Sequence, residues 1–140
     1  AKKQPGNLSF ASYSTGTISQ YTGMILNQKA GLDLQHVPFQ GSPPGLAQVM
    51  GGQIPIMFDG FATSRTLIAT GKVQAYAVAS KARLSQLPEV PTFTELGYPD
   101  IDFSNWLGVV ASAAMPAELQ EKARLAAANC PEFAIKVLED

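Results

Sequence analysis

The chain has 140 residues, of which 46% are hydrophobic, so it is long and apolar enough to bury the core of one domain. Ten basic and 11 acidic residues leave a formal net charge of −1 without any basic run, which argues against nucleic acid as a partner. No apolar stretch approaches the roughly 18 to 20 residues of a membrane span, no signal peptide is present in the given chain, and a single cysteine, Cys130, excludes an internal disulfide.

The first part of the chain predicts three units in which a strand is followed by a helix. Apolar and β-branched runs alternate with segments whose apolar residues recur at helical spacing, and a glycine follows each predicted helix. The predicted strands are Leu8 to Tyr13, Leu34 to Phe39 and Ile54 to Phe58. The predicted helices are Thr17 to Ala30, a second helix that Ser42 caps and that runs through Met50, and Ala62 to Thr70. The apolar face expected on the first helix consists of Ile18, Tyr21, Ile25 and Leu26.

The second part of the chain is less regular. A fourth strand is expected from Val73 to Ala79, followed by a proline-marked connection and a short helix from Phe93 to Leu96 that Gly97 ends. A long apolar strand is expected from Phe103 to Ala111. Pro116 then begins a helical tail, with a second piece after Pro131.

This alternation of strands and helices predicts the α/β class. Right-handed crossovers between successive strands produce a mostly parallel sheet with helices on both faces. In such open sheets, ligands bind outside the carboxyl ends of the strands, where the N-termini of the helices converge. The loops that follow the strands are therefore the candidate site.

Three strand-to-helix loops combine glycines with hydroxyl side chains. Glycine permits close approach of a ligand to the backbone, and Ser and Thr hydroxyls can donate to an oxygen ligand. Unpaired N–H groups at helix N-termini favour an anion, so together the loops suit a small carboxylate. Each loop alone is also explained as an ordinary helix cap, and Asp59 either caps the third helix or accepts from an amino or hydroxyl group of a solute. The candidate ligand-binding residues are Tyr13, Ser14, Thr15, Gly16, Thr17, Gln40, Gly41, Ser42 and Asp59.

The sequence provides no catalytic or cofactor motif. The segment Gly41 to Gly45 is not the G-x-S-x-G nucleophile elbow, and neither phosphate-binding glycine motif nor a metal-spaced His/Cys cluster is present. His36 is the only histidine, lies within a predicted strand and is interpreted as a packed or hydrogen-bonded structural residue. Without a second base, general acid–base chemistry has no partner for it. We therefore expect no enzyme activity, no metal and no cofactor.

Six segments resemble the Bug family, the substrate-binding proteins of tripartite tricarboxylate transporters. They occur in order over roughly residues 7 to 120, and they read FASYSTGTISQ from Phe10, HVPFQGS from His36, GGQIPIMFD from Gly51, GKVQAYAV from Gly71, LPEVPTFTELG from Leu87 and WLGVVA from Trp106. By position, the ligand loop of the family falls on Tyr13 to Thr17, and Gly41, Ser42 and Asp59 complete this half of the cleft. Ser14 stands where the family usually has glycine, and Gln20 where it usually has histidine.

The resemblance implies a periplasmic solute-binding protein with the type II periplasmic-binding-protein fold, whose two lobes close on a small carboxylic acid for a membrane permease. Residues 1–140 would form one α/β domain, the second lobe, and the first lobe would be missing. Residues 112–140 would form a helical tail that packs on the missing lobe or on a partner chain. The solute would be a di- or tricarboxylate, an amino acid or an aromatic acid. The alternative is a truncated or degenerate domain that serves in self-association or protein interaction, without ligand binding.

Overall fold

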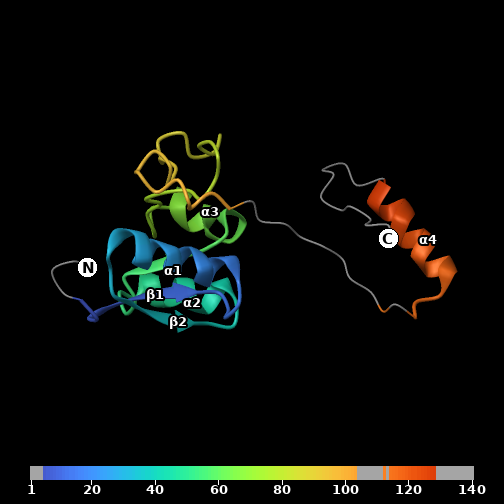
Figure 1. Cartoon of the computed structure of the whole chain (residues 1–140), viewed down its shortest axis with the longest axis horizontal. Coiled ribbons are helices and arrows are strands. Elements are labelled where there is room, and N and C mark those ends of the chain that lie inside the picture. The colour runs from blue at the N-terminus through green and yellow to red at the C-terminus, as the bar shows by residue number, and fades with distance from the viewer. Residues whose placement is uncertain (1–4, 104–111, 113, 129–140) are drawn as a thin grey trace. The chain divides into compact units, whose positions relative to one another are not determined.

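The computed structural model describes residues 5–103, 112 and 114–128 and divides the chain into two units, Ala1–Ser104 and Asn105–Asp140 (Figure 1). Strands and helices alternate in the first unit, as the sequence predicts. Its elements are β1 (Leu8–Ser12), α1 (Ile18–Ala30), β2 (Leu34–Pro38), α2 (Ser42–Met50), β3 (Ile56–Phe58) and α3 (Phe61–Ala69). The described part of the second unit contains α4 (Ala117–Ala128), which confirms the helix expected after Pro116.

The three strands form a parallel sheet in the order β2-β1-β3, with β1 in the centre. The register pairs Ser12 with Pro38 on one side and with Phe58 on the other. These three residues end their strands, so the loops that follow all begin in the same row of the sheet. This common starting row brings the three candidate loops together at one edge.

The helices α1 and α2 cover opposite faces of the sheet. A Cβ added to Gly23 of α1 would lie 2.2 Å from Cε2 of Phe10, and one added to Gly45 of α2 would lie 2.9 Å from the Met57 side chain. Phe10 is paired with Ile56, so Met57 points to the other face because side chains alternate along a strand. The predicted α/β class, with a mostly parallel sheet and helices on both faces, is therefore confirmed.

The buried face of α1 differs from the prediction. Its buried residues are Ser19, Thr22 and Gly23, whereas Tyr21 is 55% exposed. Small residues face the sheet because the Phe10 ring, only 1% exposed, already fills the space beneath the helix. The Ser19 hydroxyl also donates to the carbonyl oxygen of Phe58, which ties the first turn of α1 to the end of β3.

The segment from Thr70 to Phe103, yellow to orange in Figure 1, contains neither of the regular elements that the sequence predicts there. In place of a strand from Val73 to Ala79, only Val78 pairs, through an isolated parallel bridge to Thr92. The ladder cannot extend because Pro91 has no N–H on one side of the bridge and the Glu95 N–H on the other side donates to Thr92 Oγ1. The expected helix at Phe93 to Leu96 is a hydrogen-bonded turn.

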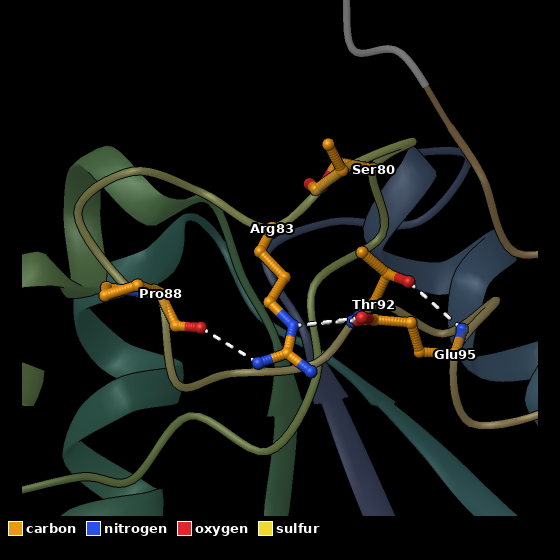
Figure 2. A network of polar contacts seen from close by, with 6 residues as sticks. Ser80, Arg83, Pro88, Thr92 and Glu95 are labelled. Atoms are coloured by element: carbon orange, nitrogen blue, oxygen red, sulfur yellow. Dashed lines mark hydrogen bonds and ion pairs between the residues drawn. The ribbon is translucent and has the colours of Figure 1, made fainter.

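Side-chain contacts hold this irregular segment in place (Figure 2). Arg83 Nε lies 3.0 Å from Glu95 Oε1, and Arg83 Nη1 donates to the Pro88 carbonyl at 2.9 Å. The Thr92 N–H donates to Glu95 Oε2 at 2.7 Å, and the Glu95 N–H donates in return to Thr92 Oγ1 at 3.1 Å, which completes a reciprocal capping box around the turn. The segment also contributes Leu87, Val90 and Ile101 to the buried core.

Some predictions fall on residues that the structure does not describe. They are residues 104–111 of the expected apolar strand, the piece after Pro131, and Cys130. Phe103 is described and lies outside any strand. Among the described residues, no helix combines the length and apolar character needed to span a bilayer.

Candidate functional site

The three candidate loops are joined by hydrogen bonds at the carboxyl edge of the sheet. The Gly41 N–H donates to the Tyr13 carbonyl at 2.8 Å, which links the loop after β1 to the loop after β2. Ser42 Oγ donates to Asp59 Oδ1 at 2.5 Å, which links the loop after β2 to the end of β3. The structure therefore brings all the sequence-predicted site segments together. Within them, Thr15, Gly16 and Gln40 are exposed, Ser42 is buried, and the others are partly buried.

None of the three helices at this edge has a side-chain cap. The N-cap residues are Thr17 for α1, Gly41 for α2 and Gly60 for α3, and no N-cap side chain forms a capping hydrogen bond. The Thr17 hydroxyl instead donates backwards to the Ser14 carbonyl at 2.8 Å. The explanation of these loops as ordinary Ser/Thr caps is therefore wrong for the structure, and N–H groups at the helix N-termini remain available to an anion.

The three N-termini differ in the donors that they provide. Ser42 is the first residue of α2 and not its cap, contrary to the sequence prediction, and Pro43 and Pro44 follow it without N–H groups. The Gly41 N–H is already bonded to Tyr13. Backbone donors at this edge therefore come mainly from α1 and α3, which follow β1 and β3. The order of the sheet places its topological switch point between these two strands.

Asp59 lies where two loops meet, and its carboxylate accepts from hydroxyl groups. Oδ1 accepts from Ser42, and Oδ2 accepts from Thr63 Oγ1 at 2.7 Å. Because Gly60 is the N-cap of α3, the expected Asx cap by Asp59 is not what the structure shows. The Ser42 hydroxyl, which the sequence predicted to face the solute, instead donates to Asp59. Each carboxylate oxygen of Asp59 thus accepts a hydrogen bond from a hydroxyl group of the protein.

A polar network that the sequence reasoning did not find lies beneath the first loop. Gln20 Oε1 accepts from the Gly16 N–H at 2.8 Å, and Gln20 Nε2 lies 3.3 Å from His36 Nδ1. His36 Nε2 lies 2.7 Å from Ser12 Oγ. The spacing of Thr17 and Gln20 matches a capping box, T-x-x-Q, and this signal could have identified Gln20 as a residue that reaches back to the loop backbone.

His36 is partly buried and packs against Phe10, with ring centroids 5.0 Å apart. Burial lowers the pKa of His36 below its ordinary value of 6.5, because the charged imidazolium loses solvation. The expectation that His36 is packed and hydrogen-bonded is confirmed. At neutral pH it is therefore an uncharged hydrogen-bonding group beneath the loop.

A pocket of about 320 Å³ opens beside the start of α1. Its lining combines the backbone of the first loop with apolar side chains and does not include Ser42 or Asp59; the lining residues are Gly16, Thr17, Ile18, Gln20, Tyr21 and Met24. In the part of the chain that the structure describes, no three His, Cys, Asp or Glu side chains form a set that could hold a metal ion.

Comparisons with known proteins give a consistent result. A family model described as "Tripartite tricarboxylate transporter family receptor" matches residues 1–139. A protein of Pseudomonas sp. (strain P51), named as a UPF0065 protein in the tcbD-tcbE intergenic region, is 37% identical over 123 residues, which are 87% of this chain and 37% of that protein. The chain therefore spans a little over a third of the length of this relative.

Two solved structures share the fold at appreciable sequence identity. One, described as a periplasmic transporter, has a TM-score of 0.82 and 33% identity, and the match covers 94% of this chain and 45% of that chain. The other is the periplasmic binding protein BugD, with a TM-score of 0.78, 29% identity and the same two coverages, 94% and 45%. The fold of this chain is thus that of a part of a periplasmic binding protein.

Proposed function

Because this chain belongs to the tripartite tricarboxylate transporter receptor family, we propose that it is a binding module for a small carboxylic acid. The solute is held at the edge formed by the loops after β1, β2 and β3. The observation that carries the proposal is that the helix N-termini at this edge have no N-cap side-chain bond, with α1 and α3 providing most of the backbone donors. Donors aimed at an edge and left unpaired by the protein suit a solute that supplies the acceptors.

The magnitude of this attraction is enough for weak binding. A helix N-terminus favours an anion by about 0.3 to 1 kcal/mol, and a hydrogen bond to a charged group contributes about 1.5 to 3 kcal/mol. Two or three such bonds, less the cost of immobilising the solute, correspond to a dissociation constant near millimolar. The described loops contain no arginine, and the hydroxyl protons of Thr17 and Ser42 are donated within the protein, so the main chain provides most of the donors.

The role of the whole protein extends this proposal. We propose that residues 1–140 act as the second lobe of a two-lobe periplasmic receptor, which delivers its solute to a membrane permease of the tripartite type. The solute is a di- or tricarboxylate, an amino acid or an aromatic acid, and no chemical step is performed on it. The 37% coverage of the Pseudomonas relative supports a role as one part of such a receptor.

Calorimetry on this chain tests the proposal, with succinate, citrate, glutamate and benzoate as solutes. The variant Ile18→Pro removes one backbone donor at the first position of α1, where proline is tolerated, and the extended conformation of Thr17, φ −101° and ψ 164°, accepts a following proline. The control Ile18→Ala shortens the same side chain but keeps the N–H.

We expect millimolar binding of at least one acid by the wild-type chain, and about a threefold to tenfold weaker binding by Ile18→Pro than by Ile18→Ala, the worth of one net hydrogen bond. Equal affinities of the two variants would count against main-chain recognition. Micromolar binding by the wild-type chain would contradict the argument that this edge is one wall of a cleft.

A second candidate function is self-association without solute binding. The side chains of Tyr21 and Met24, on the outer face of α1, are 55% and 53% exposed, and such apolar groups can mark an interface. Light scattering separates the two functions: a stable dimer that binds none of the four acids would favour self-association.

A further inference from the structure

A continuous series of hydrogen bonds begins and ends in the loop after β1. The Gly16 N–H donates to Gln20 Oε1 at 2.8 Å, Gln20 Nε2 lies 3.3 Å from His36 Nδ1, and His36 Nε2 lies 2.7 Å from Ser12 Oγ. Ser12 Oγ donates to the Ser14 carbonyl at 3.0 Å. The series thus connects the loop backbone, the first turn of α1 and the middle of β2.

The chemistry of the two ends determines the direction of every bond between them. The N–H of Gly16 can only donate, so Gln20 presents its oxygen there and its NH₂ group to His36, whose Nδ1 must accept. At the other end, the Ser14 carbonyl can only accept, so the one hydroxyl proton of Ser12 goes there and His36 Nε2 must donate. The Gly16 end thus requires Nδ1 without a proton, and the Ser14 end requires a proton on Nε2, so together they specify neutral His36 with its proton on Nε2.

The surroundings of His36 are compatible with this neutral form. β1 and α1 pack against β2, and β1 carries no titratable side chain. α1 carries Tyr21 and Lys29, and Lys29 pairs with Asp100 at 2.5 Å. Tyr13 is the titratable residue of the loop. Burial lowers the pKa of His36, and no charged group contributes to that shift.

Protonation of His36 breaks the series. An added proton on Nδ1 would face the NH₂ group of Gln20, which is also a donor. Rotation of the Gln20 amide restores that contact but then turns NH₂ toward the Gly16 N–H, so the conflict moves to the loop. One of the two bonds of Gln20 must therefore be lost.

We propose that Gln20 is the positioning residue of the loop after β1 and that it holds Gly16 only while His36 is neutral. Protonation releases the Gly16 N–H beside a positively charged imidazole, and both changes favour an anion at the loop. This consequence for solute binding rests on the function proposed above, whereas the coupling between His36 and Gly16 is a property of the chain alone.

NMR on the labelled 140-residue chain without solute tests the coupling. His36 is the only histidine, so its imidazole signals are unambiguous, and they are followed together with the Gly16 amide. The titration runs from about pH 7.5 to pH 5, across the ordinary range of histidine. The variants are Gln20→Leu, which removes both bonds, and Gln20→Glu, whose carboxylate accepts from Gly16 and from protonated His36. Gln28→Leu, an exposed position on the same helix, is the control.

In the wild-type chain and in Gln28→Leu, we expect the Gly16 amide to shift with the same midpoint as His36. Gln20→Leu should abolish most of that shift, and Gln20→Glu should raise the pKa of His36 and keep the Gly16 amide in place. A Gly16 amide that ignores the His36 titration, or that follows it equally in Gln20→Leu, overturns the proposal. The binding function is tested separately by adding succinate at about pH 7.5, where succinate and an ordinary histidine are deprotonated. Loop amide signals that do not shift on this addition would contradict the binding function, but they would not bear on the coupling between His36 and Gly16.

Discussion

At Gly23 the backbone of α1 lies directly over the Phe10 ring, and a methyl group has no room there. The added Cβ of Gly23→Ala would lie 2.2 Å from Cε2 of a ring that also packs against His36 and Phe58. Alanine gains about 1 kcal/mol in helix propensity, but overpacking costs about 1 to 3 kcal/mol. We expect Gly23→Ala to lower the free energy of unfolding by about 1 kcal/mol or more, measured by urea denaturation.

Gly45→Ala on α2 is the matched control for Gly23→Ala. Its Cβ would lie 2.9 Å from the end of the Met57 side chain, which is flexible and can move aside. The gain in helix propensity should offset most of the cost of this close contact. We therefore expect the free energy of unfolding to change by no more than about 0.5 kcal/mol. Equal destabilisation by both substitutions would show that the rigid Phe10 ring is not the cause.

Individual site residues could be predicted from the sequence only in part. The loop positions Gly16, Gly41 and Asp59 follow from where strands give way to helices. The partners of these residues do not, because the bond from Ser42 to Asp59 and the approach of Gln20 to His36 depend on the register of strands far apart in the chain. That register cannot be read from the spacing of residues in a single sequence.

Among the helices, α2 differs from α1 in having two prolines at its start, and this difference has a measurable effect. Pro43→Ala restores a backbone N–H at an N-terminus that faces the candidate site. We expect about threefold to tenfold tighter binding of succinate, the net worth of one hydrogen bond, measured by calorimetry. Pro55→Ala, at the opposite end of β3, is the control and should leave the affinity unchanged. Unchanged binding by Pro43→Ala would mean that solutes do not approach α2.

The turn at Thr92 to Glu95 is an element that depends on charge. Hydrogen bonds from Arg83 and from the Thr92 N–H lower the pKa of Glu95 below its ordinary value of 4.5. A lowered pKa means that the stabilisation is complete above about pH 4.5 and is lost as the pH falls through the pKa of the folded state. Glu95→Gln should therefore lower the urea midpoint at neutral pH. The difference between its midpoint and that of the wild type should become smaller as the pH falls. Glu89→Gln, exposed on the same segment, should show no such gap.

The regular elements near the N-terminus were easier to predict than the segment after α3. From β1 through α3, the spacing of apolar residues alternates between the period of a strand and that of a helix. The stretch from Val73 to Ala79 has the same apolar composition as a strand, yet the partner segment lacks the donors for a ladder, because Pro91 has no N–H and the Glu95 N–H is bonded to Thr92 Oγ1. The composition of a segment shows its tendency to form a strand, whereas its pairing depends on the backbone N–H donors of the neighbouring segment.

At the scale of the molecule, the buried core of the described residues lies in the first unit. Every buried hydrophobic residue among the described ones lies between Phe10 and Ile101, and Leu119 and Leu125 of α4 are 48% and 54% exposed. We expect a chain that ends at Ser104 to keep the urea midpoint and the far-UV spectrum of the first unit. A large fall in the midpoint would show that residues 105–140 contribute to the core.

The absence of side-chain caps on α1, α2 and α3 also affects how the site can be found by mutagenesis. An alanine scan removes side chains but leaves every peptide N–H in place, so much of the recognition at this edge would escape it. Replacing single amides by esters, or placing proline at first-turn positions, would remove the donors themselves. Under the proposed function, a site built on main-chain donors could change its side chains, and with them the acid it prefers, and still hold the carboxylate.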